Sequence, residues 1–295
     1  MVTIAVILGI VGILPGIGWL VSPVVSVLAC ILGGLLIRAV NAGKVEGGKG
    51  GAIAGVVLGV LGLLQAIVVW LIVLVMALVA LFSSISAGYL NAQTTAMATR
   101  GRNLFVGITQ ANIEREGSGM PAIWPTSFKT RGDDRKDISG QSFSTSTEYF
   151  NALFDMRNYG KTDWMPYVNC DLSVLSGTGN AYKGSGLLKD SNVDWLVLKG
   201  VTDDLPDVFP VLISANVDPS SLITLGSFDG SSKTPIRLGR ANGAAKDMFD
   251  NKACVVIYKS GAAYVFKVKY ATLENLYNRQ GFTLPAGIVL EYLAP

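Results

Sequence analysis

The sequence predicts a membrane-anchored α+β protein. It should have N-terminal transmembrane helices, a long helix that leaves the membrane, and a domain with a helix packed on a mainly antiparallel sheet. Three observations predict this class. Residues 1–88 carry only four charges, Arg38, Lys44, Glu46 and Lys49. An apolar stripe at helical spacing then continues through residues 83–116. Beyond Asn192, short β-branched and aromatic runs alternate with turn residues.

The composition indicates an integral membrane protein and argues against several activities. Half of the chain is hydrophobic and 15% is charged, whereas an average soluble domain is about 25% charged. The net charge of +3 is small, and no run of Lys and Arg favours nucleic acid. The chain has no histidine, the commonest general base and metal ligand, and it shows no nucleophile motif. We therefore expect a protein that is not an enzyme and needs no cofactor.

Residues 1–65 are expected to form a transmembrane helical module. Its first apolar run is too long for one span of about 20 residues, and Pro15 and Pro23 interrupt it. Two arrangements fit this run. It forms two short spans, 3–21 and 24–40, or a single span that follows a re-entrant or interfacial piece.

A Gly-rich loop, residues 38–51, follows this run. It carries three basic residues against one acid, so the positive-inside rule predicts that it is cytoplasmic. The next apolar segment repeats the pattern of residues 5–14, and its glycines predict close helix packing through Gly55, Gly59 and Gly62. The basic loop followed by GKGGAIAGVVLGVLGLL resembles the small two-span membrane modules of the DUF4190 type, a domain of unknown function.

Residues 66–116 are predicted to form one long spine helix. Its first part, 66–82, is apolar and uncharged, which is typical of a membrane span. We expect this part to pack against other apolar helices, from its own N-terminus or from neighbouring subunits. The second part, 83–116, should lie against the sheet of the soluble domain. Its apolar stripe consists of Leu90, Met97, Leu104, Phe105, Ile108 and Ala111.

Residues 117–295 are expected to form an extracytoplasmic α+β domain that starts with a surface loop, 120–141. Thr145 and Glu148 form a capping box, which predicts a helix over 146–156. A hairpin signal at Ser260-Gly261 joins two of the predicted strands. The predicted helix buries Tyr149, Phe150, Leu153 and Phe154, and a short helix covers 272–280. The predicted strands are 193–199, 208–214, 222–225, 235–238, 253–259 and 262–270.

A spine helix that is half in the membrane and half packed on an antiparallel sheet resembles type IV pilins and type II secretion pseudopilins. Four blocks carry this resemblance in the order expected of large pseudopilin-like proteins. They are NLFVGITQANIEREGSGMPAIWP, SFSTSTEYFNALFDMRNYG, WMPYVNCDLSVLSG and VTDDLPDVFPVLISANVD. The resemblance covers residues 66–295. It implies a structural role, with other secretion or pilus components as partners.

One feature of that family is missing. Its members begin with a short basic leader and then Gly or Phe, Thr-Leu-x-Glu at the start of the apolar helix, where the prepilin peptidase cuts. No such motif precedes Ala66, and extra apolar segments stand there instead. GFTLP at 281–285 only echoes the motif, at the wrong end of the chain. We therefore expect a protein that stays in the inner membrane or assembles by a different route.

One group of acids is a candidate calcium site. Asp203, Asp204 and Asp207 lie together, and Asn216 and Asp218 follow the next predicted strand. Oxygen ligands grouped in a loop suit Ca²⁺, and some pseudopilins hold calcium in a loop of their sheet domain, so the resemblance favours this reading. A solvated turn is the alternative. The spacing is not that of an EF-hand.

The cysteines and aromatic residues of the soluble part leave two further questions open. Cys170 and Cys254 could pair in an extracytoplasmic domain, although sequence does not show that they meet. Four aromatic residues either line a ligand groove or belong to the core. They are Trp124, Trp164, Tyr167 and Trp195.

Two functions fit these expectations. The first is a structural membrane protein of the inner membrane, in contact with lipid, that displays its C-terminal domain outside the cytoplasm and self-associates as a filament, ring or array. Such a filament could reach the cell surface. The second is a membrane-tethered binding or sensing module associated with secretion, with a groove near residues 164–180.

Overall fold

The computed structural model describes residues 22–44, 48–120, 122–125, 143–177, 186–201, 205–222, 227–239, 248–283 and 291–295, with isolated positions between them. The chain divides into two compact units, Met1–Ala87 and Gly88–Pro295. The helices are α2 (Ser22–Asn41), α3 (Lys49–Glu116), α4 (Ser146–Leu153) and α5 (Leu273–Leu276). The strands are β1 (Trp195–Lys199), β2 (Pro210–Ser214), β3 (Ser227–Phe228), β4 (Ala253–Tyr258), β5 (Ala263–Lys267), β6 (Phe282–Thr283) and β7 (Glu291–Leu293).

Unit 1 is built from α2 and the first part of α3. Gly33 of α2 faces Ala52 and Val56, whereas Gly59 of α3 faces Ser26 and Cys30. As the residue numbers rise along α3, the residue numbers of the facing positions on α2 fall. The two helices are therefore antiparallel. Both are long and apolar enough to cross a membrane, among the residues that the structure describes.

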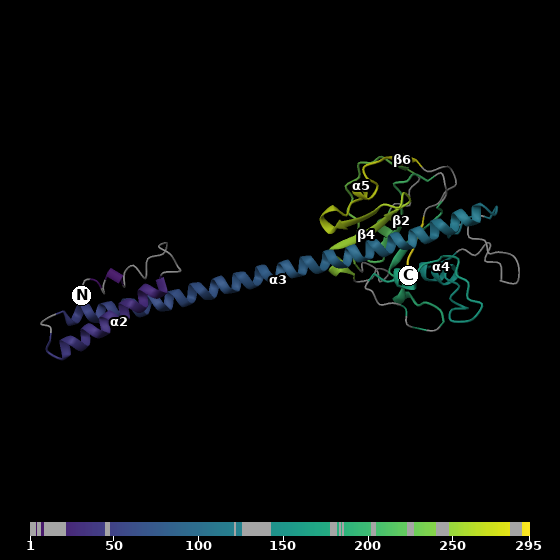
Figure 1. Cartoon of the computed structure of the whole chain (residues 1–295). Helices are drawn as coiled ribbons and strands as arrows, with labels where there is room; N and C mark the ends of the chain where they lie inside the picture. The colour runs from purple at the N-terminus through teal and green to yellow at the C-terminus, as the bar shows by residue number, and fades with distance from the viewer. Residues whose placement is uncertain are drawn as a thin grey trace. The chain divides into compact units, whose positions relative to one another are not determined.

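The long helix begins earlier than expected. α3 is one uninterrupted helix from Lys49 (Figure 1), not from Ala66, and α2 continues to Asn41. The connection is therefore shorter than the predicted loop, 38–51. Gly50 and Gly51 at its end are helical, since each costs only about 1 kcal/mol in a helix and no proline follows them. Of the predicted span 3–21, all but three positions lie outside the described residues.

Unit 2 begins with the second part of α3, whose predicted stripe is confirmed. Met97, Leu104 and Ile108 are fully buried, Phe105 and Ala111 are nearly so, and Leu90 packs at the edge of the core. Gly101 lies on the same face, where an added Cβ would stand 2.5 Å from Trp195 of β1 and 2.8 Å from Ile257 of β4. The helix backbone thus approaches the sheet very closely at this glycine.

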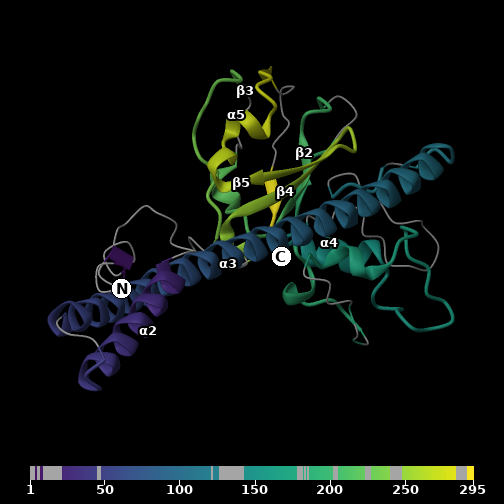
Figure 2. The same ribbon diagram turned by 60° about the vertical axis from the view of Figure 1, so that its left-hand side comes forward.

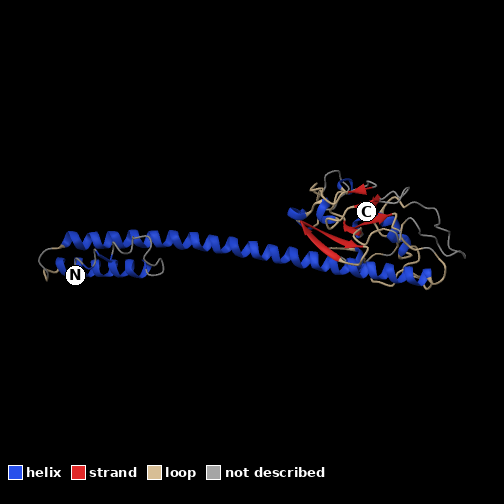
Figure 3. Ribbon diagram, turned by 90° about the horizontal axis from the view of Figure 1, so that it is seen from above, coloured by secondary structure: helices blue, strands red, loops and turns tan. Residues whose placement is uncertain are grey.

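The five-stranded sheet of unit 2 has the order β5-β4-β2-β1-β7, and all of its neighbours are antiparallel. The Ser260-Gly261 hairpin is confirmed: it joins β4 to β5, and Gly261 has the φ of +79° that such a turn requires. Every strand drawn in Figure 3 belongs to this unit. The antiparallel α+β class expected from the sequence is therefore present.

Both faces of the sheet are covered. Successive strand residues point to opposite faces. Ile257 faces α3, while the hydroxyl of Tyr258 donates to the Leu276 carbonyl of α5. On the face of the sheet that α5 covers, β3 and β6 are held by a cluster of aromatic rings from Phe209, Phe228, Tyr277 and Phe282. Figure 2 shows the same arrangement, with α3 crossing the strands and α5 and β3 beyond them.

The capping box of the second helix is confirmed. The Thr145 hydroxyl accepts from the Glu148 N–H at 3.1 Å, and the Glu148 carboxylate accepts from the Ser144 N–H at 2.8 Å. α4 ends at Leu153, earlier than the predicted 156. All four of its predicted core residues, Tyr149, Phe150, Leu153 and Phe154, are fully buried.

Several other boundaries differ from the prediction. Pro235 and Leu238 form only isolated bridges, since proline has no N–H to extend a ladder. β5 stops at Lys267, where a 3₁₀ turn, η5 (Val268–Tyr270), begins. α5 is a single turn because Asn278 and Arg279 have positive φ. β3, β6 and β7 were not predicted, and the predicted strand 222–225 lies outside the described residues after Leu222.

Candidate functional site

The predicted packing glycines lie in the interface between α2 and α3. Gly55, Gly59 and Gly62 are all buried, on one side of α3. An added Cβ at Gly59 would stand 2.6 Å from the Cys30 Sγ and 2.9 Å from the Ser26 carbonyl oxygen. The partner helix is thus the chain's own α2, and the small residues allow a close approach of the two backbones.

Replacing Gly59 with leucine should open this helix pair. A well-packed interface loses about 1–3 kcal/mol to added bulk, which corresponds to a fivefold to roughly hundredfold rise in the open population. The rate at which a maleimide alkylates Cys30 in detergent reports that opening. Gly34→Leu is the matched control, because a Cβ there meets nothing within 4 Å. Equal Cys30 rates in the two variants would contradict the close packing.

The segment 67–85 of α3 is exposed and apolar on every side. Leu71, Leu74 and Leu78 are 60%, 58% and 44% exposed, and Phe82 is 68% exposed. A helix that is apolar all round is stable only when lipid or other helices surround it. The segment is therefore a surface that requires a covering, and we refer to it as the bare segment of α3.

The structure describes only two of the four acids proposed for a calcium site. Asp203 and Asp204 lie outside the described residues. Asp207 is exposed, and its backbone carbonyl accepts from the Ser260 N–H. Asp218 is buried and caps a 3₁₀ turn by accepting from Ser220. The described part of the chain holds no group of three or more metal-ligating side chains.

Asn216, which the sequence placed beside these acids, has a structural role. Its side-chain amide is fully buried and donates to the Ala253 carbonyl at 2.8 Å, while its Oδ1 accepts from the Ser214 hydroxyl. Asn216 therefore ties the end of β2 to the start of β4. The Oδ2 atom of Asp218 is buried without a hydrogen-bond partner.

The cysteines of unit 2 are free thiols, so the disulfide that Cys170 and Cys254 could have formed is absent. Cys170 faces Gly107 of α3, whereas Cys254 lies on β4 opposite Phe266. Burial raises the pKa of each thiol from 9.0 to about 12, and the charge of Asp171 adds to the rise at Cys170. Both thiols are thus held protonated and unreactive at neutral pH.

The stability of unit 2 should fall as the pH rises from about 9 to about 12. A thiol of the unfolded chain loses its proton near 9.0, whereas Cys254 in the fold keeps its proton up to about 12. The stabilisation is complete below the unfolded pKa and is lost as the pH approaches the folded one. Burial also raises the pKa of Tyr149, Tyr258, Tyr277 and Tyr292, in the same direction.

Chemical denaturation at a series of pH values measures this loss. Cys254→Ala should flatten the decline, because it removes one of the titrating groups. A free energy of unfolding that stays constant over this range would contradict the buried, protonated state of these side chains.

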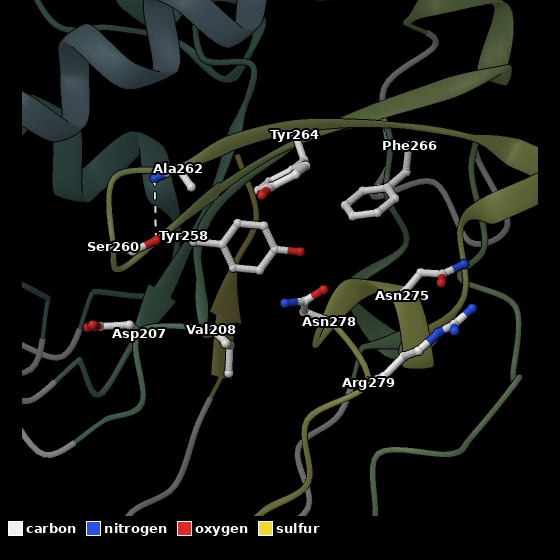
Figure 4. Close-up of a pocket in the computed structure, with 10 residues that line it drawn as sticks. All are labelled: Asp207, Val208, Tyr258, Ser260, Ala262, Tyr264, Phe266, Asn275, Asn278 and Arg279. Atoms are coloured by element: carbon white, nitrogen blue, oxygen red, sulfur yellow. Dashed lines mark hydrogen bonds between the residues drawn. The ribbon is translucent and has the colours of Figure 1, made fainter.

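A groove of about 530 Å³ lies beside the edge strand β5. Figure 4 shows Tyr258, Tyr264 and Asn278 around a shared opening, with Asp207 at one end and Arg279 at the other. The rings of Tyr258 and Tyr264 meet edge to face at 5.6 Å. Such a lining offers aromatic surface together with amide hydrogen-bond groups and charges of both signs. The sequence did not indicate this groove, because its residues come from three separate segments, 207–208, 258–266 and 275–279.

The four aromatic residues proposed for a groove have other surroundings. Trp195 is fully buried and Trp124 nearly so. The indole N–H of Trp164 donates to the Phe154 carbonyl at 2.8 Å. The ring of Tyr167 lies under the Arg115 guanidinium, at 5.9 Å. Trp124 and Trp195 are therefore core residues, and the groove of Figure 4 lies elsewhere, at β5.

Comparison with protein-family models, with curated proteins and with solved structures finds no match to the chain.

Proposed function

We propose that this protein is a structural protein of the inner (cytoplasmic) membrane that displays its α+β domain on the extracytoplasmic side. One observation carries the proposal: the bare segment of α3 is apolar and exposed over its whole circumference. The most hydrophobic 18-residue stretch of α3 has only 6% of its residues buried, whereas the core helix of a soluble protein is mostly buried. The basic residues before α3 favour a cytoplasmic start for this span.

Self-association in the membrane forms the second part of the proposal. Ala77, Ala80 and Ser84 recur at helical spacing on the bare segment, and all three are exposed. Small residues at this spacing let two apolar helices approach closely, and this motif commonly joins membrane helices. The products would be a ring, an array or a filament of identical subunits, in which other secretion or pilus components are the natural partners.

The mass of the protein after extraction in mild detergent tests self-association. We expect a large oligomer, visible by electron microscopy, that dissociates when Ala80 and Ser84 are both replaced with leucine. Replacing Val75 and Val79 with leucine is the matched control, since it adds bulk to the same segment away from the small residues. A strictly monomeric wild-type particle would exclude self-association while leaving the membrane anchor intact.

The groove at β5 favours a second function, a membrane-tethered binding module. Its aromatic rings and amide groups suit an extended peptide or a carbohydrate. Binding of the full chain to peptide and glycan arrays tests this function. Tyr264→Ala should abolish any such signal. Tyr89→Ala, which removes an equally exposed tyrosine from α3, should leave the signal unchanged.

A further inference from the structure

The helix proposed to cross the membrane carries no charge at its outer end. Between Lys49 and Arg100, α3 contains no acidic or basic residue. Membrane helices ordinarily end in interfacial Trp, Tyr, Lys or Arg, which fix their depth in the bilayer. On this stretch of α3, Tyr89 is the one aromatic residue beyond Phe82. A second anchor at the outer surface would have to come from another part of the chain.

The turn after β5 offers the missing side chains. Val268 and Tyr270 of η5 are 55% and 53% exposed, and Lys267 and Lys269 beside them are exposed as well. The Lys269 Nζ lies 5.4 Å from the centre of the Tyr270 ring. We call these four residues, 267–270, the η5 patch. Exposed apolar and aromatic groups among lysines are typical of surfaces that sit at lipid headgroups.

The backbone holds this patch in place. The Val268 N–H donates to the Lys252 carbonyl at 2.8 Å, and the Asn275 side-chain amide donates to the Tyr270 carbonyl at 2.9 Å. The turn is thus fastened to the start of β4 on one side and to α5 on the other. Its apolar side chains remain exposed because the fold directs them outward.

The direction of β5 places the patch at one end of unit 2. α3 contacts Gly261, at the tip of the β4–β5 hairpin, through Phe105, and it contacts Ile257 through Gly101. α3 therefore runs toward the tip while β5 runs away from it. The end of β5 therefore lies on the side where α3 enters unit 2 at Gly88.

The charges around the patch favour an anionic partner. Lys267 and Lys269 are joined by Lys252, whose Nζ lies 3.2 Å from the exposed Asp250 carboxylate. Glu274 of α5 is engaged by Arg279, also at 3.2 Å. Both of these acids are thus matched by a cation, and among the described residues the two lysines of the patch supply the excess positive charge.

We propose that the η5 patch is a second membrane contact, which seats Val268 and Tyr270 among anionic lipid headgroups on the surface that α3 crosses. The inference rests on the proposed function, because α3 brings the patch to the bilayer. It adds that the domain is held against the membrane rather than free above it.

The test uses the full chain in nanodiscs of phosphatidylcholine, with and without phosphatidylglycerol. An environment-sensitive fluorophore is attached at Val268→Cys. The same label at Leu187→Cys serves as control, since Leu187 is 53% exposed and is followed by Leu188, which is hydrogen-bonded to α4. Labelled wild-type protein corrects for the native cysteines.

We expect the label at position 268 to be protected from an aqueous quencher in the anionic nanodiscs, and the label at 187 to stay accessible. Replacing Lys269 with glutamine should lower the ratio of lipid-bound to free patch about fivefold. Equal quenching at the two positions in a chain that has entered the nanodiscs would overturn the inference alone. A chain that stays soluble without lipid would overturn the proposed function as well.

Discussion

Replacing Leu71 and Leu78 with aspartate should lower the fraction of the protein that is held in membranes. Both leucines lie on the bare segment of α3, where they are 60% and 44% exposed. A charge near the centre of a membrane helix costs about 2.5–3.5 kcal/mol by insertion measurements, so two of them should abolish partitioning of this segment and leave α2 as the remaining apolar helix. The measurement is the fraction of protein that sediments with membranes after a high-salt wash.

The matched control places the same charges farther along α3. Asn103→Asp and Val106→Asp change exposed positions in unit 2, outside the bare segment. This control variant should sediment like the wild type. If the variant with aspartate in the bare segment sedimented equally well, the bare segment would not be the anchor.

Replacing Gly101 with leucine should strongly destabilise unit 2. An added Cβ alone would stand 2.5 Å from the Trp195 ring, which is fully buried and fixed by a 2.8 Å hydrogen bond from its N–H to the Val174 carbonyl. Such overpacking typically costs about 1–3 kcal/mol, and leucine adds more atoms than the contact can absorb. Chemical denaturation of the full chain in detergent measures the loss.

Two companion variants separate packing from helix propensity. Asn103→Leu adds the same side chain to an exposed position of α3 and should leave stability unchanged or slightly higher. Trp195→Ala should cost about 3–5 kcal/mol by itself. Combined with Gly101→Leu, it should cost less than the sum, because the leucine enters the space that the ring leaves. Strict additivity would contradict the contact.

The helices of unit 2 could be predicted because each has a local signal. The stripe from Leu90 to Ala111 and the box of Thr145 and Glu148 encode their structure in spacing alone. The start of α3 could not be predicted in this way. Its glycines resemble a loop in sequence, yet the helix continues through them because its hydrogen bonds are worth more than their conformational entropy.

The groove and the C-terminal edge of the sheet depend on contacts that are remote in sequence. β7 has three residues and exists because Leu293 and Tyr292 pair with Val197 and Leu198 of β1. Tyr258 and Asn278 meet at the groove only after β4 and the turn beyond α5 are in place. Neither β7 nor the turn after α5 carries a periodic pattern long enough to predict these contacts.

Labelling from outside the cell can show on which side of the membrane unit 2 lies. Leu187→Cys is treated with a membrane-impermeant maleimide on intact spheroplasts. The native thiols of unit 2 react slowly, because burial raises their pKa to about 12. We expect full labelling of position 187 before the membrane is opened, because an extracytoplasmic unit 2 exposes it to the reagent. Labelling only after permeabilisation, or recovery of the protein in the soluble fraction, would contradict it.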